Sequence, residues 1–148
     1  MRNAIAILLL GFLGLMASGC NKKSDATPSV GSLRVGTNNT ITITEKEKKA
    51  DAAGVVYTLK GFKNSLAYVL QLNFTEEPTA TKVYSLDAGS TGQLNMNYTD
   101  PQKVLYRDTN VGSVTVTVTG TSLKMSGNNL RCISGTDSIA VITFSATY

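Results

Sequence analysis

Few side chains in this sequence can do chemistry, because it contains two cysteines, ten acidic residues and no histidine. Without histidine there is no imidazole metal ligand and no Ser–His or Cys–His catalytic pair. Cys132 lies in an alternating segment beside Leu130 and Ile133, where a small buried apolar side chain is the expected role. Arg131 could activate the thiol, but neighbours in a strand point to opposite faces. We expect Cys132 to be buried and unreactive.

Pairs of acidic residues could catalyse glycoside hydrolysis, which needs two carboxyl groups at a set separation across a cleft. Most acids of this chain fall in segments of turn composition, where solvated Asp and Glu are expected. Asp108-Thr109-Asn110 has part of the spacing of a calcium loop but lacks the remaining ligands, so we interpret it as a turn. No Ser-x-x-Lys motif occurs. We therefore expect no catalytic residue, no metal site and no cofactor.

The aromatic surface comes mainly from six tyrosines, because the chain has no tryptophan and only four phenylalanines. The core-facing positions of alternating segments hold Tyr57, Tyr68, Tyr84, Tyr98 and Tyr148. Their expected role is a half-buried ring with a solvated hydroxyl. Tyr106, beside Arg107, is the tyrosine least buried by pattern. Tyr106 and Arg107 are therefore the candidate ligand contacts.

One triplet is a candidate modification site. Asp137-Ser138-Ile139 resembles the Asp–Ser/Thr–aliphatic acceptor used for O-glycosylation in the periplasm of Bacteroidota. Such triplets also arise by chance in a chain this rich in Ser and Thr. Ser138 is the residue that would carry the glycan.

The N-terminal segment predicts a membrane anchor at Cys20. Met1-Arg2-Asn3 is short and basic, and residues 4–17 are apolar or Gly. This run is shorter than the ~20 residues that span a bilayer, and it suits a signal peptide of residues 1–19. Ala17-Ser18-Gly19-Cys20 resembles a bacterial lipobox, with Ala17 in place of the usual Leu. The resemblance implies cleavage before Cys20, lipid on its thiol and acylation of the new amino terminus, which together anchor a protein stably. The alternative is an ordinary signal peptide with a chance cysteine.

The residues after the anchor, 20–31, have the composition of a flexible linker. Lys22 and Lys23 would contribute about 1 kcal/mol each on contact with anionic head groups. Only Asp25 is acidic, so the signal for display on the cell surface is weak, and Asn21 is not the Asp that retains lipoproteins at the inner membrane. We expect a lipid-anchored outer-membrane protein, with the periplasmic side slightly favoured over the cell surface.

The rest of the chain, residues 32–148, alternates with a period of two, which predicts β-strands. In the clearest case, residues 112–119, Val114, Val116 and Val118 share one face. Further strands are predicted at 32–35, 40–44, 55–60, 65–74, 82–87, 92–98, 103–107, 122–126, 129–133 and 138–148. The charged residues 45–53 have no apolar stripe and indicate a solvated turn or one helical turn. The strand spacing predicts a single antiparallel domain of about 8–10 strands, a β-sandwich or a partly open barrel.

Several short motifs lie within residues 65–148: Lys82 to Leu86, Gly112 to Val118, Ser126-Gly127 and Phe144-Ser145-Ala146. Their order resembles that in small uncharacterised all-β lipoproteins of the Bacteroidota. The resemblance brings no activity and no catalytic residue.

These features predict a non-enzymatic binding or structural module of the cell envelope, whose partner is an envelope protein or a glycan. The alternatives are a small envelope hydrolase that uses carboxylates and a barrel that holds an apolar ligand. The net charge of +4 is not gathered on a basic face with aromatic residues, and no Gly-rich phosphate loop occurs. Binding of nucleic acid or nucleotide therefore has no support.

Overall fold

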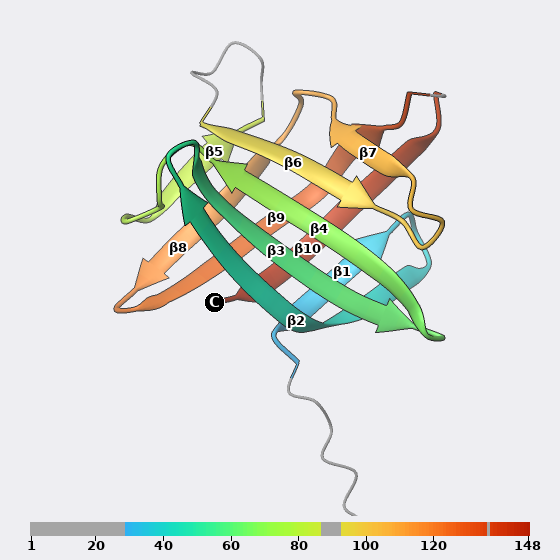
Figure 1. The fold of residues 1–148 in the computed structure, drawn as a ribbon, viewed down its shortest axis with the longest axis horizontal. Coiled ribbons are helices and arrows are strands. Elements are labelled where there is room, and N and C mark those ends of the chain that lie inside the picture. Colours follow the sequence, from blue (N-terminus) through green and yellow to red (C-terminus); the bar gives the residue numbers. More distant parts are fainter. Residues whose placement is uncertain (1–28, 87–92, 136) are drawn as a thin grey trace, which may run out of the picture.

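The computed structural model describes residues 29–86, 93–135 and 137–148 (Figure 1). Their β-strands are β1 (Gly31–Val35), β2 (Asn39–Asp51), β3 (Gly54–Lys63), β4 (Leu66–Phe74), β5 (Lys82–Ser85), β6 (Leu94–Thr99), β7 (Leu105–Asp108), β8 (Ser113–Thr119), β9 (Ser122–Ile133) and β10 (Ile139–Thr147). None of the described residues is helical. The prediction of an all-β fold is confirmed.

The strands form one antiparallel sheet that closes on itself. Eight of them follow the order β1-β2-β3-β4-β6-β7-β9-β10, and β10 pairs with β1 to complete a barrel. The first half of β9 also pairs with β8, which in turn pairs with the short β5. The second half of β9 pairs with β7. Antiparallel pairing is thus confirmed, and the sheet closes as a barrel instead of dividing into the two layers of a sandwich.

Apolar side chains fill the barrel. Alternate residues of β3, β4, β6 and β10 point inward and are buried. The largest fully buried side chains belong to Leu33, Ile41, Ile43, Tyr57, Leu59, Leu70, Leu72, Phe74, Leu86, Met96, Tyr98 and Met125. Gly127 shows how tight the packing is, because an added Cβ would lie 2.5 Å from Leu130 Cδ1 and 2.8 Å from Phe144 Cε1. The interior is a packed core with no room for a further side chain at this point.

Residues 45–51 of the charged stretch continue β2 and residues 52–53 form a turn, so the expectation of a turn over 45–53 was wrong for most of the segment. Glu45 lies opposite Lys60 and Asp51 lies opposite Gly54, which makes β2 13 residues long. β1 pairs with β2 only as far as Ile43, so among the described strands the second half of β2 is paired on one edge alone, and its side chains are exposed. Such a half-strand buries neither face and therefore shows no apolar period. Charged residues on an exposed edge also discourage pairing with another chain.

The two strands predicted at 122–126 and 129–133 form one long strand, β9, with a β-bulge between them. The register against β10 shifts between Ile142 and Phe144. Asn129 takes a φ of 51°, and its N–H donates to Thr143 Oγ1 at 3.0 Å. Because of the extra residue, the inward-facing positions are odd-numbered up to Gly127 and even-numbered from Leu130 onward. This break in the alternation is why two separate strands were expected.

Strand β8 has the two faces that its alternation predicted. Val114 and Val116 are fully buried, whereas Thr115 and Thr117 are exposed. Val118 is only partly buried against the core.

The folded domain begins slightly before residue 32, because Gly31 is the first residue of β1 and Val30 is already bonded. The Val30 N–H donates to the Ile43 carbonyl, and the Thr147 N–H donates to the Val30 carbonyl, both at 2.9 Å. The predicted signal peptide, Cys20 and most of the linker lie outside the described residues. In the part of the chain that is described, no helix is long and apolar enough to cross a membrane.

Candidate ligand-binding site

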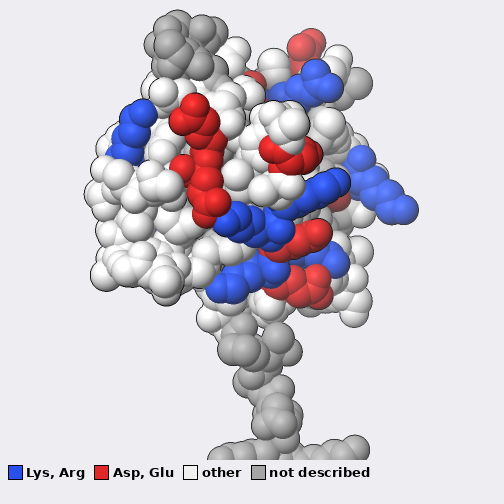
Figure 2. All heavy atoms as spheres, turned by 60° about the vertical axis from the view of Figure 1, so that its left-hand side comes forward, with Lys and Arg blue, Asp and Glu red and all other residues white. Residues whose placement is uncertain are grey.

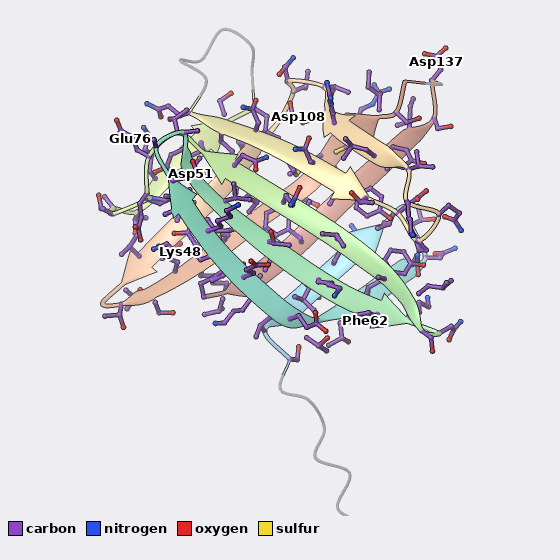
Figure 3. The ribbon with its side chains drawn as sticks, viewed as in Figure 1. Lys48, Asp51, Phe62, Glu76, Asp108 and Asp137 are labelled. Atoms are coloured by element: carbon purple, nitrogen blue, oxygen red, sulfur yellow. The ribbon has the colours of Figure 1, made fainter. Side chains whose placement is uncertain are left out.

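The strand ends make two mouths, at opposite ends of the barrel (Figure 1). One mouth lies at the turns after β1 and β3, the loop between β6 and β7 and the start of β10. The other lies at the turn between β2 and β3, the loop between β4 and β5 and the chain end at Tyr148. Figure 3 shows Lys48, Asp51 and Glu76 at the second mouth and Phe62 near the first.

The first mouth contains a hollow of about 380 Å³. This volume falls within the range of small-molecule sites, and barrel mouths are common places for them. Its polar and aromatic lining consists of Asn39, Tyr68, Tyr98, Asp100, Gln102 and Tyr106. We call these six residues the tyrosine mouth.

The hairpin of β6 and β7 brings two of these rings together. Tyr98 and Tyr106 are direct cross-strand partners, and their ring centres lie 5.5 Å apart with the planes tilted by 39°. The loop between the strands is held by Asp100, whose Oδ1 accepts the Val104 N–H at 2.9 Å. The Asp100 carbonyl accepts the Lys103 N–H at 3.0 Å. The loop therefore fixes the Asp100 carboxylate beside the paired rings.

Hydrogen bonds occupy two of the three tyrosine hydroxyls at this mouth. Tyr106 donates to Asp100 Oδ2 at 3.3 Å, and the Asn39 amide donates to the Tyr68 hydroxyl at 3.2 Å. None of the hydrogen bonds found at this mouth uses the hydroxyl of Tyr98, a residue only 2% exposed that lines the hollow. Tyr98 thus presents an unpaired polar group at the hollow.

The hydroxyls of Tyr98 and Tyr106 keep their protons at neutral pH. Burial raises the pKa of Tyr98 above its ordinary value of 10.0, and the Asp100 charge raises it further. Burial also raises the pKa of Tyr106, with added effects from the charge and hydrogen bond of Asp100. Both phenols are therefore available as hydrogen-bond donors.

The structure separates the two residues predicted as ligand contacts. Tyr106 lies at the tyrosine mouth, but Arg107 faces the other way and lines a different hollow with Leu105 and Ile133. Alternation along β7 causes this separation. Tyr98 and Asp100 were missed as site residues, although the Asp100-Pro101 turn between two alternating segments was a signal for the hairpin that joins them.

Ser138 lies next to the tyrosine mouth. It is exposed and precedes Ile139, which lines the hollow. Its carbonyl accepts the Ser134 N–H at 3.0 Å, and Asp137 takes a φ of 63°. The position is accessible, and modification of Ser138 stays a prediction.

Charged side chains cover the second mouth. Its members are Lys46, Lys48, Tyr57, Glu77 and Tyr148, which we call the lysine mouth. Lys48 forms an ion pair with Glu77 and lies 6.0 Å from the Tyr57 ring centre, while Lys46 lies 5.2 Å from that of Tyr148. Figure 2 shows acidic and basic side chains gathered side by side on this face, next to a broad area without charge.

Tyr57 is sealed beneath these charges. Its ring is fully buried and packs edge-on against Phe74 and Tyr148, at 5.7 and 4.8 Å between centres. Its hydroxyl is buried and has no hydrogen-bond partner among the described residues. Burial, with smaller contributions from the charges of Glu77 and Tyr84, raises the pKa of Tyr57 to about 12. A buried unpaired hydroxyl costs roughly 1–3 kcal/mol.

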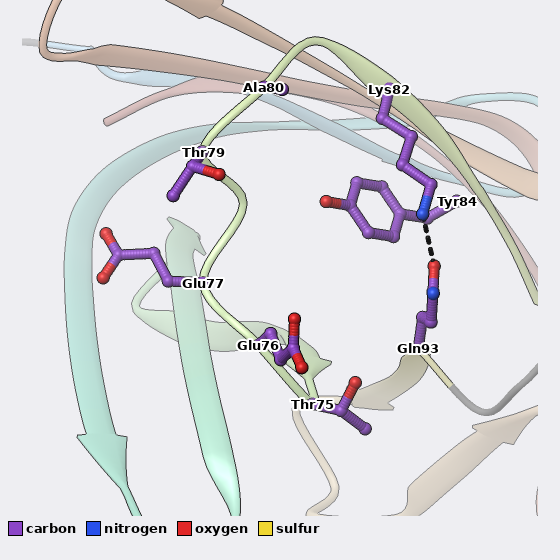
Figure 4. A pocket seen from close by; sticks show the side chains of 8 residues that line it. All are labelled: Thr75, Glu76, Glu77, Thr79, Ala80, Lys82, Tyr84 and Gln93. Carbon is purple, nitrogen blue, oxygen red and sulfur yellow. Dashed lines mark hydrogen bonds between the residues drawn. The ribbon is translucent and has the colours of Figure 1, made fainter.

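A polar hollow lies beside the lysine mouth, along the loop between β4 and β5 (Figure 4). Glu76 and Glu77 both line it, but their carboxylates point in different directions, and Glu77 is paired with Lys48. Lys82 donates to Gln93 Oε1 at 2.6 Å and lies 5.0 Å from the Tyr84 ring centre. This arrangement does not bring two carboxylates to bear on one point.

Two further candidates have structural roles. Cys132 is fully buried, as predicted, and burial raises the pKa of its thiol to about 12, with a smaller effect from Asp108. The Asp108 carboxylate accepts backbone N–H groups of Met96 at 2.7 Å and Asn110 at 2.9 Å, so both oxygens serve the fold. Within residues 29–86, 93–135 and 137–148, no group of three potential metal ligands comes together.

Comparisons with protein-family models, with curated proteins and with solved structures find no match for this chain.

Proposed function

We propose that this protein is a lipid-anchored, non-enzymatic binding module of the bacterial cell envelope, and that it binds its ligand at the tyrosine mouth. The anchor is the predicted lipid on Cys20, and the outer membrane is the expected membrane. The resemblance to Bacteroidota lipoproteins is part of the same proposal.

The observation that carries the binding role is the unpaired hydroxyl of Tyr98 at the hollow. Tyr98 lines the hollow, where a ligand can supply the hydrogen-bond partner of its hydroxyl. Here Tyr106 and Asp100 flank it on a hairpin fixed by backbone hydrogen bonds. Such a prearranged set of groups binds a ligand at low cost in conformational entropy.

Neither alternative gains comparable support. A carboxylate hydrolase needs two converging acids, and Asp100 is the sole carboxylate among the described residues that line the tyrosine mouth. A barrel for an apolar ligand needs an empty interior, whereas Leu59, Leu70 and Met96 are fully buried inside this one. A surface binding module agrees best with a filled barrel.

The membrane anchor is tested by replacing Cys20 in the full chain. We expect Cys20→Ala to move the protein from the membrane to the soluble fraction and to abolish labelling with palmitate. Cys132→Ala is the matched control, because this buried thiol cannot carry lipid, and it should leave both readouts unchanged. A Cys20→Ala variant that still sediments with membranes and incorporates palmitate contradicts the anchor.

The binding site is tested by NMR of the full chain in detergent with isotope-labelled tyrosine rings. A detergent extract of the envelope should shift the signals of Tyr98 and Tyr106 and leave those of Tyr57 in place. Shifts confined to Tyr57 and Tyr148 would move the site to the lysine mouth. An extract that shifts none of these signals contradicts the binding role.

A further inference from the structure

We infer that the ligand of the tyrosine mouth is a neutral saccharide. The inference rests on the proposed function, because it takes that mouth to be the binding site. It adds the chemical class of the ligand, which follows from the lining of the hollow.

The polar groups of the hollow suit a ligand that both donates and accepts hydrogen bonds. Asp100 is a pure acceptor, and its Oδ2 is held by Tyr106 at 3.3 Å, a long bond that a ligand hydroxyl can replace. The protonated Tyr98 hydroxyl both donates and accepts, and Gln102 offers an amide. Sugar hydroxyl groups match this mixture, since each donates one hydrogen bond and accepts others.

The apolar part of the hollow suits the carbon face of a sugar ring. Leu66 and Ile139 are 47% and 54% exposed although both are large apolar residues, and both line the hollow. The half-buried ring of Tyr106 lines the same hollow and lies beside the ring of Tyr98. Aromatic and aliphatic side chains around a few polar groups are the usual composition of a small-molecule site.

An anionic ligand fits the hollow poorly. Asp100 would repel it, and no Lys or Arg side chain lines the hollow among the described residues. The nearby Lys63 ammonium is bonded to Asn39 Oδ1 at 2.7 Å. Phosphate and carboxylate groups normally need charge-assisted donors, and none of the described residues that line this mouth supplies one.

A purely apolar ligand also fits poorly. It would cover the carboxylate of Asp100 and the hydroxyl of Tyr98 without giving either a hydrogen bond. Asp100 would keep its bonds from Val104 and Tyr106, but covering its charge and the Tyr98 hydroxyl without a further partner costs free energy, most of all for the charge. The polar lining therefore selects against acyl chains.

The direction of the chain relates this mouth to the start of the described domain. Val30 bonds to the Ile43 carbonyl and receives the Thr147 N–H, so the described chain begins at the lysine end of the barrel. β1 then runs toward the tyrosine mouth, where Val35 and Gly36 line the hollow. The tyrosine mouth is therefore at the end of the barrel opposite the one where the described chain begins.

The test is calorimetric titration of the full chain in detergent with four neutral disaccharides: chitobiose, cellobiose, maltose and mannobiose. Glucose 6-phosphate and laurate serve as the anionic and apolar probes. We expect at least one disaccharide to bind in the micromolar to millimolar range and neither probe to compete. Tyr98→Phe and Asp100→Asn should each weaken that binding at least roughly tenfold, the factor that a lost hydrogen bond to a buried or charged partner commonly gives. Tyr57→Phe is the matched control, since it removes the same hydroxyl from the other mouth and should leave binding unchanged.

Three results would overturn the inference. The first is that none of the four disaccharides binds at millimolar concentration. The second is that laurate or glucose 6-phosphate binds at Tyr98. The third is that Tyr57→Phe and Tyr98→Phe weaken disaccharide binding equally. If an envelope extract still shifts the Tyr98 signals when the disaccharides fail, the site stands and only the saccharide assignment falls. If the extract also leaves Tyr98 unmoved, the proposed binding function falls with it.

Discussion

The two mouths of the barrel each hold a buried tyrosine whose hydroxyl forms no hydrogen bond with the described residues, yet their surroundings differ. Tyr98 lines a hollow of about 380 Å³, whereas Tyr57 is sealed beneath Lys48, Glu77 and Tyr148. At the first mouth the unpaired group can meet a ligand. At the second it is a cost to the fold.

The difference arises from what the strand ends place over each ring. At the lysine mouth, the free half of β2 carries Lys46 and Lys48, whose ammonium groups lie over the rings of Tyr148 and Tyr57. At the tyrosine mouth, the rim residues Leu66 and Ile139 leave the hollow open. An inward-facing tyrosine can therefore be a binding group, as at Tyr98, or a core residue, as at Tyr57. The difference depends on whether charged side chains from a neighbouring strand cover it.

The largest change in stability is expected for a core substitution between the two mouths, which tests whether a packed core separates them. Leu70 is fully buried, midway along β4 between Tyr68 and Leu72, and Leu72 is the partner of Tyr57. Leu70→Ala should lower the free energy of unfolding by about 2–5 kcal/mol, because a cavity opens in a packed core. Urea unfolding followed by circular dichroism measures the change.

The neighbouring Gln71→Ala is the control, because Gln71 is half-exposed on the outer face of the same strand. It should cost less than about 1 kcal/mol. Equal costs for the two variants would mean that the barrel is hollow between the mouths, and the distinction between them would fail.

A second prediction uses alkaline pH. The pKa values of Cys132 and Tyr57, ordinarily 9.0 and 10.0, are both raised to about 12 by burial. Between these values the unfolded chain binds fewer protons than the folded one, so stability falls as pH rises. This contribution is complete below pH 9 and is lost by about pH 12, at roughly 1 kcal/mol per unit for each group.

Variants separate the two groups. Relative to the wild-type chain, Cys132→Ala should lose less stability from pH 9 upward, and Tyr57→Phe should do so only from pH 10 upward. Urea midpoints at closely spaced pH values give both onsets. A wild-type stability that stays flat up to pH 12 would show that neither group is shielded from water.

The sequence predicted the inward faces well, because alternation is a local signal. The inward residues Leu94, Met96 and Tyr98 of β6 and Ala140, Ile142 and Phe144 of β10 follow from period two alone. The closure of the sheet into a barrel could not be predicted from this alternation. It depends on pairing between Gly31 and Ala146, which are far apart in the chain, and no local pattern encodes that contact.

The candidate site was predictable only in part, for a similar reason. Tyr106 was found because it looked poorly buried, but its exposure does not reveal its neighbours. Tyr98 and Asp100 join it through the register of the β6–β7 hairpin, and Asn39 and Ile139 arrive from distant strands. A site assembled by closure of a barrel cannot be read from one segment.

A smaller change in stability is expected when the hydroxyl of Tyr57 or of Tyr98 is removed, and the two changes should differ. Tyr57→Phe should raise the free energy of unfolding by about 1 kcal/mol, because it removes a buried polar atom without a partner. Tyr98→Phe should change stability by less than about 0.5 kcal/mol, since its hydroxyl adjoins the hollow and can be hydrated. Thermal and urea unfolding measure both. Destabilisation by Tyr57→Phe would show that this hydroxyl is bonded after all, and the contrast between the mouths would disappear.

The smallest effect concerns the ion pair over Tyr57. The side chains of Lys48 and Glu77 are 39% and 46% exposed, so Glu77→Gln should cost no more than about 0.5 kcal/mol, less at high salt. The clearer consequence of Glu77→Gln is electrostatic, because after burial the charge of Glu77 contributes most to the raised pKa of Tyr57.

Glu77→Gln should therefore lower the pKa of Tyr57, as measured by ring-carbon NMR. Glu76→Gln is the matched control, since the charge of Glu76 raises the pKa of Tyr84. If Glu76→Gln lowered the pKa of Tyr57 as much as Glu77→Gln does, the loop between β4 and β5 would not hold Glu77 over this ring. The lysine mouth would then be an open surface like its counterpart.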